Sequence, residues 1–255
     1  MSKIKIFLDP GHGGTDRYNK GPTGYIEADG MLDVALKLRD ELLSTGAFEV
    51  KMSREKDMTV GVRERGKMAA RWGADMFISE HSNATGWANN TTKRGVDVFY
   101  SVDIPSDRTF ANNMSKAIAE AMGTKNNGAK TWESTKYPGE DYLGVIDAAQ
   151  DGGVKHVLLI ENGFHDNAQD EAILKDPAKR LAIAKAQAKV ICDFYRVQYP
   201  VVKKEEPEMW KKNIVKEAFD LGLITSDEWI DKADETATIW FVLAVVINVF
   251  KKLKG

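Results

Sequence analysis

The sequence has a single cysteine, Cys192, among its 255 residues. One cysteine forms neither an intrachain disulfide nor a thiolate metal cluster, so any metal site must use histidines and carboxylates. A surplus of one sign of charge is also lacking, because the sequence has 36 basic and 38 acidic side chains and a formal net charge of −2. A protein that binds nucleic acid through phosphate contacts needs a surplus of Lys and Arg. A neutral polymer or a small molecule is therefore the expected partner, and nucleic acid is not.

Long hydrophobic runs are missing as well. Lysines and Asp9-Pro10 interrupt the N-terminal stretch before a signal-peptide core of roughly 7–15 apolar residues forms. We therefore expect the protein to be made in the cytoplasm without a signal peptide. The longest apolar run, 239–246, is well short of the roughly 20 residues that span a bilayer. We expect no membrane insertion and interpret this run as a buried helix or a self-association surface.

Strand and helix patterns alternate along most of the chain. Residues 3–8 alternate polar and apolar side chains and stop at Asp9-Pro10-Gly11, as a strand does where it enters a loop. An apolar stripe with helical spacing follows, formed by Met31, Val34, Ala35, Leu38 and Leu42. Similar patterns predict strands at 49–53, 76–80, 95–101 and 156–161, and helices at 60–72, 109–122 and 177–198. This order predicts an α/β fold, with a sheet covered by helices on both faces.

The character of the chain changes near residue 200. Residues 199–207 contain two prolines and a run of charges without periodicity, which is typical of a linker. Helical patterns at 210–221 and 233–253 follow it. We therefore predict a domain at 1–198, a linker at 199–207 and a small all-α domain at 208–255. The last is near the lower size limit for independent folding, so we expect it to form a homodimer through the apolar face at 239–250 or to bury that face internally.

Two of the four histidines stand where predicted strands end. His12 follows the first strand in the segment 9–14, Asp-Pro-Gly-His-Gly-Gly, and His81 ends the strand that starts at Met76. Either histidine alone would be interpreted as a hydrogen-bonded loop residue. Because loops at the strand ends of one sheet gather at the same place, two such residues favour a shared site. Asp9 is a candidate to orient one of the rings by accepting its second N–H.

Two carboxylates are candidates to complete such a site. A catalytic zinc site typically takes three ligands from His and carboxylate and leaves one position for water. Glu27 opens the first helix, where the helix dipole also favours an acid, so spacing alone favours that structural role over ligation. Glu161 ends a buried strand, where an acid is costly unless it faces a cleft or a cation. Beside a metal site it is a candidate general base.

Four sequence features, in this order along the chain, resemble a known family. They are the segment 9–14, Glu27, the segment 74–84 (Ala-Asp-Met-Phe-Ile-Ser-Glu-His-Ser-Asn-Ala) and the segment 161–167 (Glu-Asn-Gly-Phe-His-Asp-Asn). Together they are similar to the zinc-dependent N-acetylmuramoyl-L-alanine amidases of the type-3 amidase family, over about residues 3–197. The resemblance implies a twisted, mostly parallel sheet flanked by helices. It also implies that Zn²⁺ is held by His12, Glu27 and His81 and that Glu161 is the catalytic acid and base. The implied reaction cleaves the amide between N-acetylmuramic acid and L-alanine in bacterial peptidoglycan.

Some residues depart from the family pattern or lie in its loops. Glu80 replaces an apolar residue, and strand alternation places it on the face opposite His81, so it is not expected to be a ligand. His165 is a candidate substrate contact, with a surface-loop histidine as the alternative. Further candidate contacts to sugar or peptide are the loop aromatic residues Trp87, Trp132 and Tyr142, for which loop packing is the alternative.

The expected biological role follows from the resemblance and the domain order. We expect an amidase that is made in the cytoplasm without a signal peptide and acts on the cell wall after its release. Two kinds of enzyme fit this description: a phage endolysin and a mother-cell lytic enzyme of a spore former. A catalytic domain, a linker and a small C-terminal unit for wall targeting or dimerisation favour the endolysin. Two alternatives remain open: a zinc peptidase of the stem peptide, and a catalytically inactive wall-binding protein.

Overall fold

The computed structural model describes residues 3–86, 90–200, 209–230, 245–247 and 249. The chain divides into two compact units, Met1–Pro200 and Val201–Gly255. Each unit is described by itself. Among the described residues, no helix combines the length and the apolar character needed to cross a membrane.

The first unit is built on one six-stranded sheet with the order β2-β1-β3-β6-β4-β5. All neighbouring strands pair in parallel except β4 and β6, which are antiparallel. The central strands are apolar on both faces, as expected for strands covered by helices on both sides. The mostly parallel α/β fold is thus confirmed. The strands are β1 (Ile4–Pro10), β2 (Phe48–Met52), β3 (Met76–Asn83), β4 (Val96–Tyr100), β5 (Asn126–Lys130) and β6 (His156–Phe164).

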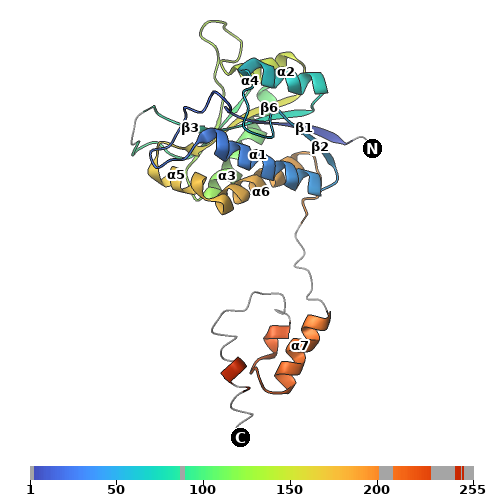
Figure 1. The fold of residues 1–255 in the computed structure, drawn as a ribbon. Helices are drawn as coiled ribbons and strands as arrows, with labels where there is room; N and C mark the ends of the chain where they lie inside the picture. Colours follow the sequence, from blue (N-terminus) through green and yellow to red (C-terminus); the bar gives the residue numbers. More distant parts are fainter. Residues whose placement is uncertain (1–2, 87–89, 201–208, 231–244, 248, 250–255) are drawn as a thin grey trace. The chain divides into compact units, whose positions relative to one another are not determined.

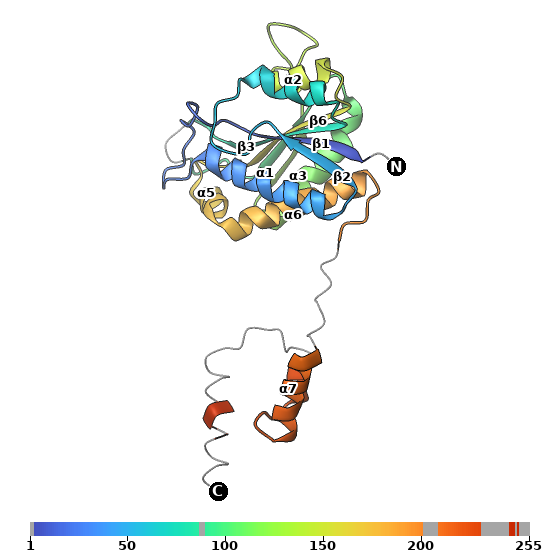
Figure 2. The same ribbon diagram turned by 45° about the vertical axis from the view of Figure 1, so that its right-hand side comes forward.

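Helices cover both faces of this sheet (Figures 1 and 2). One face carries α2 (Val62–Trp72) and α4 (Gly144–Asp151), and the other carries the four helices α1 (Glu27–Ser44), α3 (Arg108–Met122), α5 (Ala168–Lys175) and α6 (Pro177–Phe194). A short 3₁₀ turn, Pro105–Asp107, precedes α3. Strand alternation explains the two cores, since Ile6 and Leu8 pack into the α1, α3 and α6 side while Phe7 packs into the α2 and α4 side.

Three elements of this unit were not predicted from the sequence. The strand β5 reads Asn-Asn-Gly-Ala-Lys, and Asn and Gly are depleted in strands, so only its pairing with β4 at the sheet edge defines it. The helices α4 and α5 are eight residues each, too short for a clear helical period. Pairing with β4 selects β5, whereas burial against the sheet and neighbouring helices selects α4 and α5.

In the second unit, the structure describes α7 (Met209–Asp220) and a 3₁₀ turn at Asp227–Ile230. The helix predicted at 210–221 is therefore confirmed. Most of the predicted helix at 233–253, and with it most of the apolar face at 239–250, lies outside the described residues; 245–247 and 249 are helical. The linker predicted at 199–207 also falls largely outside them. The wall-targeting or dimerisation role stays a prediction.

Candidate metal centre

The carboxyl ends of β1, β3 and β6 bring the candidate ligands together. His12 lies in the loop after β1, His81 lies in β3, and Glu27 is the first residue of α1. One ligand atom from each residue lies within 4.8 Å of the other two. The Oε1 atom of Glu27 is 3.4 Å from Nε2 of His12 and 3.0 Å from Nδ1 of His81. The three residues form a group with the composition of a catalytic zinc site, two imidazoles and one carboxylate.

The loop that carries His12 has an unusual backbone, and the site depends on it. His12 has φ of 58°, in the left-handed region that few residues other than glycine adopt. Gly11 lies directly against the His81 ring, because a Cβ at this position would stand 2.3 Å from Cε1 of His81. The Asp-Pro-Gly-His-Gly-Gly segment is therefore shaped to bring one histidine over another, with ring centroids 4.9 Å apart and an interplanar angle of 80°.

Glu27 is the buried centre of the group, with 1% of its side chain exposed. Its Oε1 accepts a hydrogen bond of 2.9 Å from the Ser82 amide, and its Oε2 has no hydrogen-bond partner among the described residues. Burial opposes the charged carboxylate, but hydrogen bonds and charges from His12 and His81 outweigh burial and lower the pKa of Glu27 below its ordinary value. A carboxylate that keeps its charge with one buried oxygen unpaired fits a metal ligand.

The second nitrogen of His12 is held by Asp16, with Nδ1 and Oδ2 2.8 Å apart. The expectation that Asp9 orients a histidine ring is wrong. Asp9 is fully buried and accepts hydrogen bonds from Arg65, Ser53 and Ser79 instead. These bonds occupy both carboxylate oxygens of Asp9, and the ring of His12 pairs with Asp16 instead. Burial by itself would lower the pKa of His12, but the neighbouring carboxylates of Glu27 and Asp16 have the larger effect and raise this pKa to about 9.

Glu161 stands beside the ligand group on β6. It is the register partner of His81 on β3 and of Asp97 on β4. Its Oε2 is shielded from solvent and has no hydrogen-bond partner in the described part of the chain. Burial and the negative charges of Glu27 and Asp97 raise the pKa of Glu161 well above its ordinary value. Asp97 is itself paired with Lys130 and accepts a hydrogen bond of 3.3 Å from Asn83.

Glu80 and His165 both turn away from solvent. Glu80 lies on the opposite face of β3 from the ligand group, as predicted, and accepts hydrogen bonds from the side chains of Asn162 and Gln187. Burial raises the pKa of Glu80 to about 7 despite these bonds. Only 4% of the His165 side chain is exposed. Its Nδ1 atom lies 3.9 Å from Oε2 of Glu27 and 2.9 Å from the carbonyl oxygen of Ser82. The alternative of a surface-loop histidine is wrong, because β6 runs on to Phe164 and leaves His165 buried behind the ligand group.

Two of the predicted aromatic contacts form an exposed pair. The rings of Trp132 and Tyr142 stack with centroids 4.3 Å apart, and 47% and 54% of these residues are exposed. Phe99 of β4 lies beneath Trp132, with ring centroids 6.1 Å apart. The loop aromatic residues therefore pack on one another and still present a surface. Trp87 lies outside the described residues, and the role of all these residues in substrate binding stays a prediction.

A small cavity of about 160 Å³ opens beside the two histidines. Its wall includes His12 and His81 and a set of apolar residues: Val60, Val62, Leu143, Val145 and Leu159. The sequence patterns did not reveal it, because the apolar residues come from the ends of α2 and α4 and from β6, which are far apart in the chain. We refer to it as the centre cavity.

The sequence profile of the N-acetylmuramoyl-L-alanine amidase family matches residues 6–193. The chain belongs to this family. The match spans the sheet, the ligand group and Glu161, and it confirms the resemblance drawn from the four sequence segments. The catalytic domain of CwlV, an N-acetylmuramoyl-L-alanine amidase from Bacillus (Paenibacillus) polymyxa var. colistinus, is similar in structure, with 26% identity and a TM-score of 0.65 over 76% of this chain and 99% of that one.

Relatives of this family member include both bacterial and phage proteins. N-acetylmuramoyl-L-alanine amidase CwlM of Bacillus licheniformis is 33% identical over 72% of this chain and 66% of its own length. The sporulation-specific N-acetylmuramoyl-L-alanine amidase of Bacillus subtilis is 30% identical over 72% and 66%. The endolysin of Bacillus phage SPP1 is 28% identical over 78% and 68%. The chain thus spans about two thirds of these relatives.

Proposed function

We propose that this amidase-family chain is a peptidoglycan hydrolase that cleaves the amide between the lactyl group of N-acetylmuramic acid and L-alanine. The observation that carries the proposal is the juxtaposition of the ligand group with Glu161. His12, Glu27 and His81 converge within 4.8 Å, and Glu161 stands in register beside His81. A general base next to a three-ligand metal site is the arrangement that metal-assisted amide hydrolysis needs.

The residues present fit a zinc ion. Two imidazoles and one carboxylate form the ligand set of several catalytic zinc sites, and this set leaves a coordination position for water. The unpaired Oε2 of Glu27 adds to the fit, because it is free to bind a metal. So does the contact of His12 Nδ1 with Asp16, because zinc-binding histidines donate their second N–H to a partner such as a carboxylate. When bound, zinc would polarise the scissile carbonyl and lower the pKa of the attacking water.

The protein side of the mechanism rests on Glu161. Its carboxylate takes a proton from the attacking water as the water adds to the amide carbon. The resulting carboxylic acid then delivers that proton to the leaving nitrogen of L-alanine, because an unprotonated amine anion leaves poorly. The shielded position of Glu161 and the charges of Glu27 and Asp97 raise its pKa, which favours the second transfer. Asp16 holds the His12 ring in place throughout.

Products formed from purified cell wall test the function directly. An amidase releases free L-alanine amines without new reducing sugars. A zinc peptidase of the stem peptide, for which the same ligand set would serve, exposes other amines, and an inactive wall-binding protein exposes none. The loss of L-alanine amines in Glu161→Gln would link the activity to this site. New amines from any other residue would contradict the proposed bond.

We infer that the protein acts on the cell wall as a phage endolysin. The similarity to the SPP1 endolysin over 78% of this chain supports this role. The similarity to the sporulation-specific amidase of Bacillus subtilis supports the second candidate, a mother-cell lytic enzyme. Co-expression with a pore-forming membrane protein distinguishes them: lysis of growing cells supports the endolysin, whereas activity restricted to walls of sporulating cells supports the mother-cell enzyme.

A further inference from the structure

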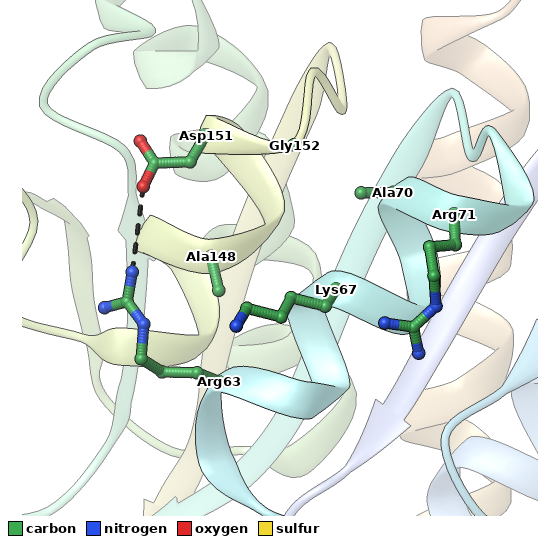
Figure 3. Close-up of a pocket in the computed structure, with 7 residues that line it drawn as sticks. All are labelled: Arg63, Lys67, Ala70, Arg71, Ala148, Asp151 and Gly152. Carbon is green, nitrogen blue, oxygen red and sulfur yellow. Dashed lines mark ion pairs between the residues drawn. The ribbon is translucent and has the colours of Figure 1, made fainter.

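A surface groove of about 470 Å³ follows the contact between α2 and α4 (Figure 3). Its volume lies within the roughly 300–1,000 Å³ of ordinary ligand sites. The small residues Ala148 and Gly152 line the α4 side together with Asp151, so a bound chain can approach the helix closely. The α2 side supplies the cations Arg63, Lys67 and Arg71. We refer to it as the α2–α4 groove.

The three cations of the groove form one stripe, because residues four apart lie on the same face of a helix. Two of them have partners in the chain: Arg63 pairs with Asp147 and, at 3.7 Å, with Asp151, and Arg71 pairs with Glu64. Lys67 is exposed and stands between them; its charge helps to lower the pKa of Glu64, but no acid of the described residues lies within 4.0 Å of its ammonium group. Because acids of the chain already pair with Arg63 and Arg71, Lys67 is the cation of the stripe that is left for an anionic ligand.

The groove adjoins the centre cavity. Val62 lines the cavity, and the next residue, Arg63, lines the groove. From Val62 to Lys67 the helix advances about 7.5 Å, and an extended peptide advances about 3.3–3.6 Å per residue. Two or three residues of an extended peptide that leaves the cavity at Val62 and follows α2 therefore span the distance to Lys67.

We propose that the α2–α4 groove binds a carboxylate of the stem peptide, with Lys67 as its charge partner. The inference rests on the proposed function, since it assigns a direction to the substrate. Stem peptides carry acidic side chains and a terminal carboxylate, whereas the glycan next to the scissile bond has neutral sugars. The cationic groove thus matches the peptide, and the uncharged aromatic pair of Trp132 and Tyr142 matches the sugars.

The test measures the activity of Lys67→Ala and Lys67→Glu on two soluble muropeptides. In one, the carboxylates of the stem peptide are free acids; in the other, the same groups are amidated and therefore uncharged. For the acidic substrate, we expect Lys67→Ala to raise KM about two- to five-fold, as for the loss of an exposed ion pair, and Lys67→Glu to raise it more. The kcat values and the KM for the amidated substrate should stay unchanged. Lys179→Glu is the matched control, because Lys179 is an exposed lysine on α6, on the other face of the sheet.

An unchanged KM in both Lys67 variants, or an equal change for the two substrates, would overturn the proposal. So would an effect seen only on whole walls that carry phosphodiester polymers, since it would assign the groove to such a polymer. If the parent protein cleaves neither muropeptide, the proposed function fails, and calorimetric binding of the acidic stem peptide then decides about the groove. Weaker binding to Lys67→Glu than to the parent supports it, and equal binding overturns it.

Discussion

His81 and Glu161 are register partners on the adjacent parallel strands β3 and β6. Register partners in neighbouring strands place their side chains on the same face of the sheet. The proposed metal ligand and the proposed proton-transfer group are thereby held by backbone hydrogen bonds between two central strands of the sheet. Their spacing does not depend on the conformation of a loop.

Substitution of the proposed base, Glu161, should lower turnover without changing the fold or the zinc content. Glu161→Gln keeps the size of the side chain but cannot take a proton, so we expect turnover to fall by about 10²–10⁴-fold. Zinc content and thermal unfolding should match those of the parent. Near-normal turnover would show that another group transfers the protons.

Metal dependence should follow the ligand group. We expect one zinc per chain, loss of activity on chelation and its return when zinc is added back. His81→Ala removes one of three ligands, so its zinc content after dialysis should fall well below that of the parent. Full zinc content in His81→Ala would show that the metal is bound elsewhere.

Asp16 should act on the metal through His12. Because Nδ1 of His12 is 2.8 Å from Oδ2 of Asp16, Asp16→Asn weakens the partner that holds the ring. Loss of such a partner typically costs about 10–100-fold in metal affinity. Competition with a zinc chelator measures this directly. Asp29→Asn is a control, since Asp29 pairs with Arg17 at the surface of the same region. An equal affinity in parent and Asp16→Asn would contradict the assignment.

The pH dependence of the metal-free protein should reflect His12. Burial lowers its pKa, but Glu27 and Asp16 raise it from 6.5 to about 9. A folded-state pKa above the unfolded one means that protonation stabilises the fold below pH 6.5 and that this stabilisation is lost as the pH rises through about 9. The unfolding free energy of chelated protein should therefore decline over this range relative to His12→Gln. Parallel pH profiles in the two proteins would refute it.

Residues beyond the sheet unit should be dispensable for bond cleavage. The four proposed site residues, His12, Glu27, His81 and Glu161, all belong to the compact unit Met1–Pro200. A chain that ends at Pro200 should digest soluble wall fragments at close to the parent rate, bind whole cells less and run as a monomer. Loss of activity on soluble fragments with zinc still bound would show that the second unit helps to build the active site.

Local patterns in the sequence determined the elements that carry the site. The period-two pattern of β1 and the helical stripe of α1 follow from which side chains must be buried, and burial repeats every few residues. His12, His81 and Glu161 were identifiable as candidates because each stands where such a pattern ends, whereas the ligand role of Glu27 came from the family resemblance. The ordered segments around them were sufficient to indicate the family before any contact was known.

Only the tertiary structure decided which residues meet. The partner of His12 is Asp16 and not Asp9, because Ser53, Arg65 and Ser79 occupy the carboxylate of Asp9. His165 is buried because β6 continues to Phe164. The α2–α4 groove joins residues 63–71 to residues 148–152, whose proximity depends on how two helices pack over the sheet. Periodicity reports burial along one segment, whereas register and packing between distant segments set these contacts, and no local pattern encodes them.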